Sequence, residues 1–411
     1  MGNYSAIVAK LENVRKHPNA DRLQLAEAAF EQVIVGLDHG DGEIGVFVPA
    51  GTTLDSAFLL ANGLYRKHPE TGELIGGYIE SNGRVRFQKL RGEMSRGLWL
   101  PMSCLSYLNL KQLPAVGTAF GELDGHAICQ KYVEKVVKQG KPGKAPSELF
   151  ENFYRVGDTG KLVNNLHQLK EGDVLVFTEK LHGTSGRTGY MPYKATRNWM
   201  DKIFAWFNAE RQRKYEVVSG TRNTILAENP YHTSDNYRQQ AHDLLRPFLQ
   251  RGQVVYYEIV GPDIMPAHTP NGIDDKATKQ EIKRKYGDEI AYTYGVPQGN
   301  HEIYIYKIVE HTIDGTAITY SWDQLEDWCK LRGLKTVPVL HKMIYCEDVR
   351  DLLHAAKYWA EKSSALCDQH PSEGVVVHTK YGPMKHKSNT FCLLEDIRPY
   401  DEPENEYTVA E

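Results

Sequence analysis

The segment DVLVFTEKLHGTSGR, residues 173–187, has the pattern of a buried strand that ends in a reactive loop. Its apolar residues 174–177 are followed by Glu179 and Lys180, and the chain then turns at Gly183. A lysine at the mouth of a buried strand can act as a nucleophile, because burial and neighbouring cations disfavour its ammonium form. A surface lysine whose aliphatic stem lies along the protein has the same local sequence. The partners of Lys180 therefore decide between these interpretations.

The composition indicates a globular protein of two or three domains, since 411 residues are too many for one ordinary core. The net charge of −4 means that any nucleic-acid site must come from a local basic surface. The six cysteines are scattered and never form a Cys-x-x-Cys pair, which argues against a zinc ribbon or a disulfide framework. We find no signal peptide and no apolar run long enough to span a membrane. We therefore expect a soluble cytoplasmic protein without a membrane partner.

Residues 1–135 contain short alternating or apolar segments separated by turn clusters such as DHGDG (38–42). This spacing predicts a small all-β barrel. The segment RVRFQKLRGEMSR (84–96) is strongly basic and has a single acidic residue, Glu93. Its basic residues are Arg84, Arg86, Lys89, Arg91 and Arg96. They favour either a nucleic-acid surface or a solvated strand edge that is protected from aggregation by its charge.

Two stretches of this region, HPNADRLQLA (17–26) and KLRGEMSRGLWLP (89–101), resemble the tRNA-binding OB module of some aminoacyl-tRNA synthetases. An OB barrel presents one sheet face to nucleic acid through cationic and aromatic side chains. The resemblance implies that the five basic residues of segment 84–96 bind RNA without reading its sequence.

We place a lysine-rich linker at 136–150 and a second domain at 151–411. Within this domain, residues 194–214 are aromatic and basic, which favours a solvated amphipathic helix or arm over a nucleic-acid contact. The acidic residues 395–411 are predicted to end in disorder.

Four later segments each carry a polar residue on or next to an apolar run. Glu258 lies in QVVYYEIVG (253–261), Tyr306 in HEIYIYKIV (301–309), and Glu373 in SEGVVVHT (372–379). The segment MKHKS (384–388) places Lys385 and Lys387 on one face of a strand. Each segment alone also has an ordinary explanation: a carboxylate that is hydrogen-bonded to backbone at a strand end, a tyrosine in the core, or lysines on a solvated strand edge.

In order, however, these segments resemble the motif set of the covalent nucleotidyltransferases, the superfamily of polynucleotide ligases and mRNA-capping enzymes. DNA ligases and capping enzymes typically have Lys-x-Asp-Gly, whereas the sequence Lys180-Leu181-His182-Gly183 is similar to that of RNA ligases. With an OB-like module in front, the chain resembles the nick-sealing RNA ligases that join 3′-OH and 5′-phosphate ends in duplexes. This implies an α+β fold: an N-terminal OB-fold β-barrel followed by a ligase-type nucleotidyltransferase domain of antiparallel sheets flanked by helices.

The resemblance implies a reaction in which Lys180 forms a lysyl-AMP intermediate with ATP, assisted by Lys385 and Lys387. Glu373 is the candidate ligand for Mg²⁺ or Mn²⁺, since both ions prefer oxygen ligands. The resemblance gives the ribose hydroxyls to Glu258 and the adenine face to Tyr306. The nucleotide-binding set that it implies comprises Glu179, Leu181, His182, Gly183, Arg187, Arg222, Glu258 and Tyr306. Glu179 has a second interpretation as a structural acid, which we favour.

The implied partner is nicked duplex RNA or an RNA/DNA hybrid, bound by a monomer mostly through phosphate contacts. We expect the N-terminal module to be required for sealing and dispensable for formation of the AMP adduct. The alternatives are a capping-type guanylyltransferase, a DNA-specific ligase, and a non-catalytic RNA-binding protein on a nucleotidyltransferase scaffold. The first would need a trailing OB domain, for which the residues after Lys387 are too few.

Overall fold

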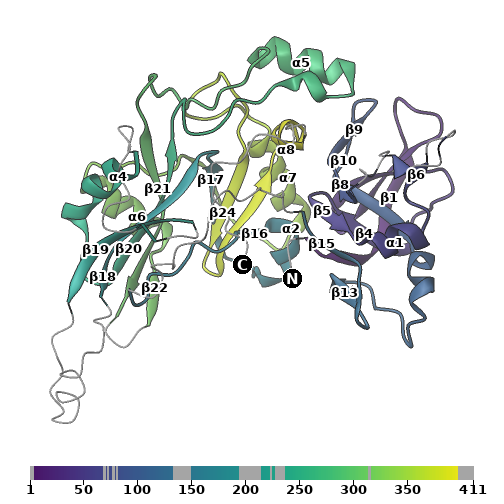
Figure 1. The fold of residues 1–411 in the computed structure, drawn as a ribbon, viewed down its shortest axis with the longest axis horizontal. Helices are drawn as coiled ribbons and strands as arrows, with labels where there is room; N and C mark the ends of the chain where they lie inside the picture. Colours follow the sequence, from purple (N-terminus) through teal and green to yellow (C-terminus); the bar gives the residue numbers. More distant parts are fainter. Residues whose placement is uncertain are drawn as a thin grey trace, which may run out of the picture.

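The structure, a computed structural model, describes residues 4–67, 71, 74–75, 79, 82–132, 150–193, 214–222, 225–226, 237–312 and 316–396. It has a β-rich N-terminal part, purple to blue in Figure 1, and a larger C-terminal part, teal to yellow. The predicted linker (136–150), amphipathic arm (194–214) and acidic tail (395–411) lie outside the described residues except at their ends. Among the described residues, no helix is long and apolar enough to cross a membrane.

The N-terminal part is organised by an antiparallel sheet in the order β11-β4-β1-β2-β3, with β12 added beside β1. The bounds are β1 (Ala6–Lys16), β2 (Gln24–Ala28), β3 (Glu31–Val35), β4 (Ile44–Pro49), β11 (Gly97–Pro101) and β12 (Ala119–Phe120). The first half of β1 pairs with β4 and its second half with β2, and the register shifts between Glu12 and Arg15. Asn13 has a positive φ at this irregularity. A bulge of this kind bends a strand so that it can serve two neighbours.

The two ends of this sheet approach one another. The backbone N–H of Arg96 donates to the carbonyl of Gln32, in β3, at 2.9 Å. The Gln32 side-chain amide donates to the carbonyl of Met94 at 2.9 Å. The sheet therefore curls toward closure, as a small barrel requires. The assignment of this barrel to the OB family stays a prediction.

Short elements complete the N-terminal part. They are β5 (Thr52–Leu54), α1 (Ser56–Ala61), β6 (Arg66–Lys67), β7 (Leu74–Ile75), β8 (Arg84–Val85), β9 (Gln88–Leu90), β10 (Glu93–Ser95), β13 (Glu122–Leu123), β14 (His126–Ala127) and β15 (Cys129–Lys131). The hairpin of β9 and β10 carries part of the basic segment predicted to bind RNA. Figure 1 shows this hairpin on the side that faces the C-terminal part.

The C-terminal part contains two five-stranded sheets among its described residues. One has the order β16-β25-β24-β17-β23, with β16 (Gly160–Lys161), β17 (Val174–Lys180), β23 (Val339–Ile344), β24 (Gly374–Thr379) and β25 (Gly382–Lys387). The other has the order β19-β18-β20-β21-β22, with β18 (Thr184–Pro192), β19 (Tyr215–Thr221), β20 (Gln253–Val260), β21 (Glu302–His311) and β22 (Ala317–Thr319). All pairs are antiparallel except β16 with β25, which is parallel.

The chain passes from one sheet to the other through residues 181–183, between β17 and β18. A Cβ on Gly183 would collide with the carbonyl of Ile259 and would lie 3.1 Å from Cγ of Glu258. Glycine is therefore required where the crossing runs against β20. The sequence pattern around Lys180 thus marks the junction of the two sheets.

Helices cover both sheets of the C-terminal part. They are α2 (Leu162–Asn165), α4 (Tyr237–Leu245), α5 (Lys276–Tyr286), α6 (Trp322–Lys330), α7 (Val349–Ala360) and α8 (Asn389–Asp396). A capping box between Ser321 and Gln324 begins α6. Leu352 and Ala356 of α7 pack in one core with Val375 of β24. Mixed α+β architecture with antiparallel sheets and flanking helices is therefore confirmed.

Candidate active site

The register of three adjacent strands brings the predicted lysines and glutamate together. Gly374, the first residue of β24, pairs with Lys180 at the end of β17 and with Lys387 at the end of β25. Glu373 immediately precedes Gly374, so it lies between the two lysines. A Cβ on Gly374 would collide with the carbonyl of His386, and its φ of 148° also disfavours other residues. This glycine lets the three strand ends approach closely.

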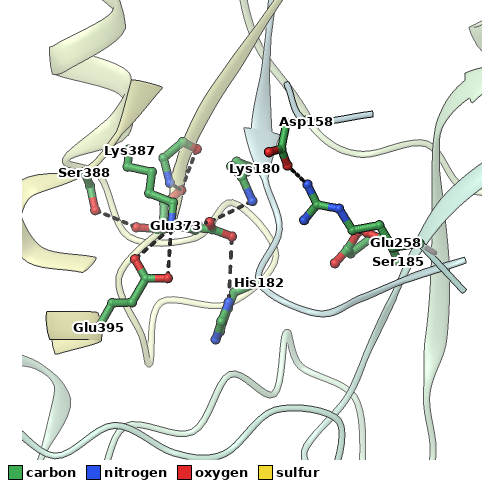
Figure 2. A network of polar contacts seen from close by, with 12 residues as sticks. Asp158, Lys180, His182, Ser185, Glu258, Glu373, Lys387, Ser388 and Glu395 are labelled. Carbon is green, nitrogen blue, oxygen red and sulfur yellow. Dashed lines mark hydrogen bonds and ion pairs between the residues drawn. The ribbon is translucent and has the colours of Figure 1, made fainter. Parts of the chain in front are cut away.

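Glu373 is the centre of the polar network in Figure 2. Its Oε1 lies 2.7 Å from Nζ of Lys180 and 3.3 Å from Nζ of Lys387. Its Oε2 lies 3.8 Å from Nδ1 of His182. Only 5% of the Glu373 side chain is exposed, compared with 25% for Lys180. Burial alone would raise the pKa of Glu373, but the two ammonium groups outweigh it and hold this pKa well below its usual value.

The two lysines of β25 have different environments. Nζ of Lys387 lies 2.7 Å from a carboxylate oxygen of Glu395 in α8, and with Glu373 this raises its pKa against the effect of burial. Lys385 is also partly buried and lies near the charges of Lys180 and Lys387. Burial and these two cations lower the pKa of Lys385 to about 7. Lys387 is thus a fixed cation, whereas Lys385 titrates near neutral pH.

The second sheet supplies Glu258 and Tyr306 to the same cavity, which has a volume of about 1660 Å³. Ser185 of β18 pairs with Glu258 of β20, and its hydroxyl donates to Oε2 of Glu258 at 2.9 Å. Burial is the main cause that raises the pKa of Tyr306, and the negative charge of Glu258 is the second cause. An acidic acceptor and an aromatic ring therefore lie on one wall, with Lys180 and Glu373 also lining the cavity.

Of the two arginines predicted to bind nucleotide, only Arg222 lines this cavity. Its guanidinium is paired with Asp158, which also lines the cavity (Figure 2). Arg187 differs from the prediction because its side chain is only 1% exposed. It donates to the carbonyls of Thr221 and Arg222 at 2.8 and 2.7 Å. Arg187 thus holds the backbone of Arg222 and does not reach the cavity.

Two residues beside Lys180 line the cavity and also contact the protein interior. Glu179 is buried, and its Oε2 accepts a hydrogen bond from the backbone N–H of Ala365 at 2.9 Å. Burial raises the pKa of Glu179 to about 7. The hydrogen bond from Ala365 supports the structural role that we favoured. Leu181 is part of the apolar core. Contact of these two residues with nucleotide stays a prediction.

His182 is buried behind Glu373. Its backbone N–H donates to the hydroxyl of Tyr294 at 2.6 Å. Its ring lies 4.7 Å from that of Tyr292 and 4.8 Å from that of Phe391, measured between centroids. This aromatic surround fixes the ring so that Nδ1 faces the Glu373 carboxylate.

The five basic residues of segment 84–96 do not share one environment. Arg84 lines the cavity, with its guanidinium 4.3 Å from the centroid of the Tyr132 ring. Arg86 and Lys89 are partly exposed, and Arg91 is exposed. Arg96 is the exception, because only 7% of it is exposed and it contacts the C-terminal part. The predicted role of Arg96 as an RNA contact does not fit this burial.

The structure also adds residues that the sequence did not single out: Asp158, Lys161, Ser185 and Glu395. Lys161 pairs with Lys385 through the parallel bridge of β16 and β25. Burial is the main cause that lowers the pKa of Lys161 to about 8. Glu395 was assigned to the acidic tail, but it lies in α8 and pairs with Lys387. No local motif distinguishes these residues, because their proximity depends on strand pairing and on a helix that folds back.

Comparison with known proteins identifies a family and several similar solved structures. Residues 173–391, more than half of the chain, match the RNA ligase family. The chain is similar to the structure of a Naegleria gruberi RNA ligase mutant with ATP and Mn, with a TM-score of 0.60 and 17% identity over 94% of this chain and 98% of that one. It is also similar to the same ligase with PPi, with a TM-score of 0.60 and 17% identity over 95% of this chain and 98% of that one. The search among curated proteins gave no match.

Proposed function

Because this chain belongs to the RNA ligase family, we propose that it is an ATP-dependent enzyme that seals 3′-OH/5′-phosphate nicks through a lysyl-AMP intermediate. The observation that supports this most is the convergence of Lys180 and Lys387 on Glu373 in a cavity that Glu258 and Tyr306 also line. An amine nucleophile, fixed cations and a nucleotide-sized pocket are what covalent nucleotidyl transfer needs.

In the first step, the neutral amine of Lys180 attacks the α-phosphorus of ATP. A nitrogen–phosphorus bond forms, the bond to the bridging oxygen breaks, pyrophosphate leaves, and the amine releases a proton. Lys387 and the protonated form of Lys385 stabilise the negative charge that develops on the phosphate oxygens. Their opposite pKa shifts suit different tasks: Lys387 stays charged, and Lys385 exchanges its proton near neutral pH.

For nucleotide binding, we assign the ribose hydroxyls to Glu258, which Ser185 orients, and the adenine face to Tyr306. Arg222 is the arginine that we assign to phosphate, because it lines the cavity and its backbone is held by Arg187. Gly183 contributes by its small size, which lets the sheet junction close against Glu258.

For a divalent cation, the fitting group is the carboxylate of Glu373. Within the described ranges, no three His, Cys, Asp or Glu side chains form a group that could hold a metal ion. Mg²⁺ is commonly held by one or two carboxylates together with substrate phosphates and water, so Glu373 with bound ATP satisfies this pattern. When bound, Mg²⁺ or Mn²⁺ would neutralise phosphate charge. The similar Naegleria structures with ATP and Mn support both cofactors.

In the later steps, AMP passes from Lys180 to the 5′-phosphate of the nicked strand, which forms a 5′–5′ pyrophosphate. The 3′-OH then attacks that phosphate and AMP leaves. We assign nicked duplex RNA, or an RNA/DNA hybrid, to the N-terminal part, through Arg84, Arg86, Lys89 and Arg91. Arg96 is excluded from this set because of its burial.

The test is the intact mass of the protein after incubation with Mg²⁺ and either ATP or GTP. We expect one added AMP with ATP, no addition with GTP, and no addition in Lys180→Ala. A GMP adduct would favour a guanylyltransferase, and no adduct with either nucleotide would favour a non-catalytic protein. Sealing of a nicked RNA duplex, compared with a nicked DNA duplex, then tests the nucleic-acid substrate.

A further inference from the structure

Arg96 is a buried guanidinium of the N-terminal part that contacts the catalytic part. Its backbone is fixed on both sides, since its N–H donates to the carbonyl of Gln32 and its carbonyl accepts from the N–H of Ala50 at 3.0 Å. Its Nε lies 2.7 Å from Oε2 of Glu31, at the start of β3. Burial alone would lower the pKa of Arg96, but the charge of Glu31 raises it, so the guanidinium remains charged. Its charge is therefore satisfied within its own domain.

The other guanidinium nitrogens of Arg96 reach across to the strand that carries Lys387. One donates to Oδ1 of Asn389, the first residue of α8. The other donates to the backbone carbonyl of Lys387 at 3.4 Å. A planar guanidinium can make these divergent contacts at once, whereas a lysine ammonium at the same place could not. Arg96 thus holds the end of β25 from the N-terminal part.

The same strand end places the Lys387 ammonium between Glu373 and Glu395. The helix that carries Glu395 is itself held between the two parts of the molecule (Figure 1). On one side, Cys392 and Leu393 of α8 pack against Met94 of β10. On the other, Phe391 and Leu394 belong to the core of the catalytic part. Both partners of the Lys387 side chain are therefore fixed in the catalytic part, while the carbonyl of Lys387 is fixed by Arg96.

We propose that Arg96 is a positioning residue for Lys387, so that the N-terminal part takes direct part in nucleotidyl transfer as well as in holding the nicked duplex. This inference rests on the proposed function only in that Lys387 is assigned to phosphate. It replaces the expectation from sequence that the N-terminal part is dispensable for AMP-adduct formation. Displacement of Arg96 lets the end of β25 move, and Lys387 then departs from the position in which it meets phosphate.

The first test measures the position of Lys387 without any activity. Wild type, Arg96→Gln and Asn389→Ala are labelled briefly with acetic anhydride, and modification of each lysine is quantified by peptide mass spectrometry. We expect labelling of Lys387 to rise several-fold in both variants. Two lysines of the same molecule serve as references: Lys380, which is exposed, and Lys307 of β21, which is partly buried. Unchanged labelling of Lys387, or an equal rise at Lys307 in both variants, would overturn the proposal.

The second test is the single-turnover rate of AMP-adduct formation at saturating ATP. Misplacement of a catalytic group by about 1 Å can cost about 100-fold in rate, so we expect a loss of about 10- to 100-fold in Arg96→Gln and a smaller loss in Asn389→Ala. The matched control is Lys10→Gln, an exposed cation of β1 in the same domain, which should keep the wild-type rate. Rates within about twofold of wild type in both variants would refute the inference, whereas a wild type without any AMP adduct would instead refute the proposed function.

Asn389→Ala distinguishes the loss of an interdomain contact from a folding defect. Arg96→Gln leaves the buried Glu31 without its partner, which can destabilise the N-terminal part. Asn389→Ala removes one of the two interdomain contacts of Arg96 from the other side and leaves that ion pair intact. The backbone N–H of Asn389, which donates to Glu361, is also retained. The proposal requires both variants to change Lys387 in the same direction.

Discussion

Replacement of Glu373 by glutamine tests the centre of the proposed site. Glutamine keeps the shape of the side chain but removes the charge that faces Nζ of Lys180 at 2.7 Å and Nζ of Lys387 at 3.3 Å. Loss of a preorganised charged group from an active site typically costs 10²- to 10³-fold in rate, so we expect AMP-adduct formation to slow by about 100-fold or more.

The same substitution should destabilise the fold. Removal of one partner of a buried ion pair costs about 3–5 kcal/mol. We expect about 3 kcal/mol, the lower end, because Lys180 is one quarter exposed and Lys387 keeps Glu395. The control is Glu326→Gln, which breaks an exposed pair with Lys342 and should cost less than about 1 kcal/mol. Urea unfolding of wild type and both variants measures these differences.

The pKa shift of Glu373 determines how the stability difference between wild type and Glu373→Gln changes with pH. The pKa of Glu373 is depressed in the folded protein, so its stabilising contribution is present above the unfolded value of about 4.3. It is lost as the pH falls from there through the folded pKa. The stability gap between wild type and Glu373→Gln should therefore be full at neutral pH and shrink in acid. A gap that stays constant from neutral pH to strong acid, or an AMP-adduct rate equal to that of wild type, would refute the assignment.

Two further predictions concern the cations around the cavity. Burial and the charges of Lys180 and Lys387 lower the pKa of Lys385 to about 7, so its cationic form is lost as the pH rises above that value. The KM for ATP should therefore rise toward alkaline pH, by at most about tenfold per pH unit, and Lys385→Arg should remove this dependence; a pH-independent KM in wild type would contradict it. Arg187→Met removes two hydrogen bonds to carbonyls, each worth about 1.5–3 kcal/mol, and should raise the KM for ATP at least tenfold by releasing Arg222. Steady-state kinetics with the exposed Arg251→Met as control checks this, and an unchanged KM would show that Arg222 does not depend on Arg187.

The strands of the catalytic part were predictable because each one is an apolar run next to a polar residue. Segments 253–261, 301–309, 372–379 and 384–388 all correspond to strands, β20, β21, β24 and β25. The proximity of Lys180, Glu373 and Lys387 needed a second fact, the pairing of Gly374 with both lysines. The order of motifs along the chain predicted that these residues act together, and the register explains why they can.

The sequence did not show which way the side chain of a buried arginine points. Segment 84–96 mixes basic and apolar residues, and this composition is the same whether a guanidinium faces solvent or a neighbouring domain. Arg91 lies at a turn with positive φ and is exposed, whereas Arg96 lies between two strands and meets Glu31 and Asn389. Glu395 was missed for a related reason, since an acidic stretch near a terminus is typical of a solvated tail. Only the return of α8 against β10 turns its carboxylate toward Lys387.

Arg187 and Arg96 share a physical role that no sequence pattern reveals. Each guanidinium donates to the backbone carbonyl of a residue that we assign to phosphate: Arg187 to that of Arg222 at 2.7 Å, and Arg96 to that of Lys387 at 3.4 Å. The charged groups of these two residues are held as well, that of Arg222 by Asp158 and that of Lys387 by Glu395 and Glu373. Anchoring the backbone fixes the root of each side chain, so that both the root and the charged tip are positioned before phosphate binds. The buried arginines thus supply the rigidity, and Arg222 and Lys387 supply the charge.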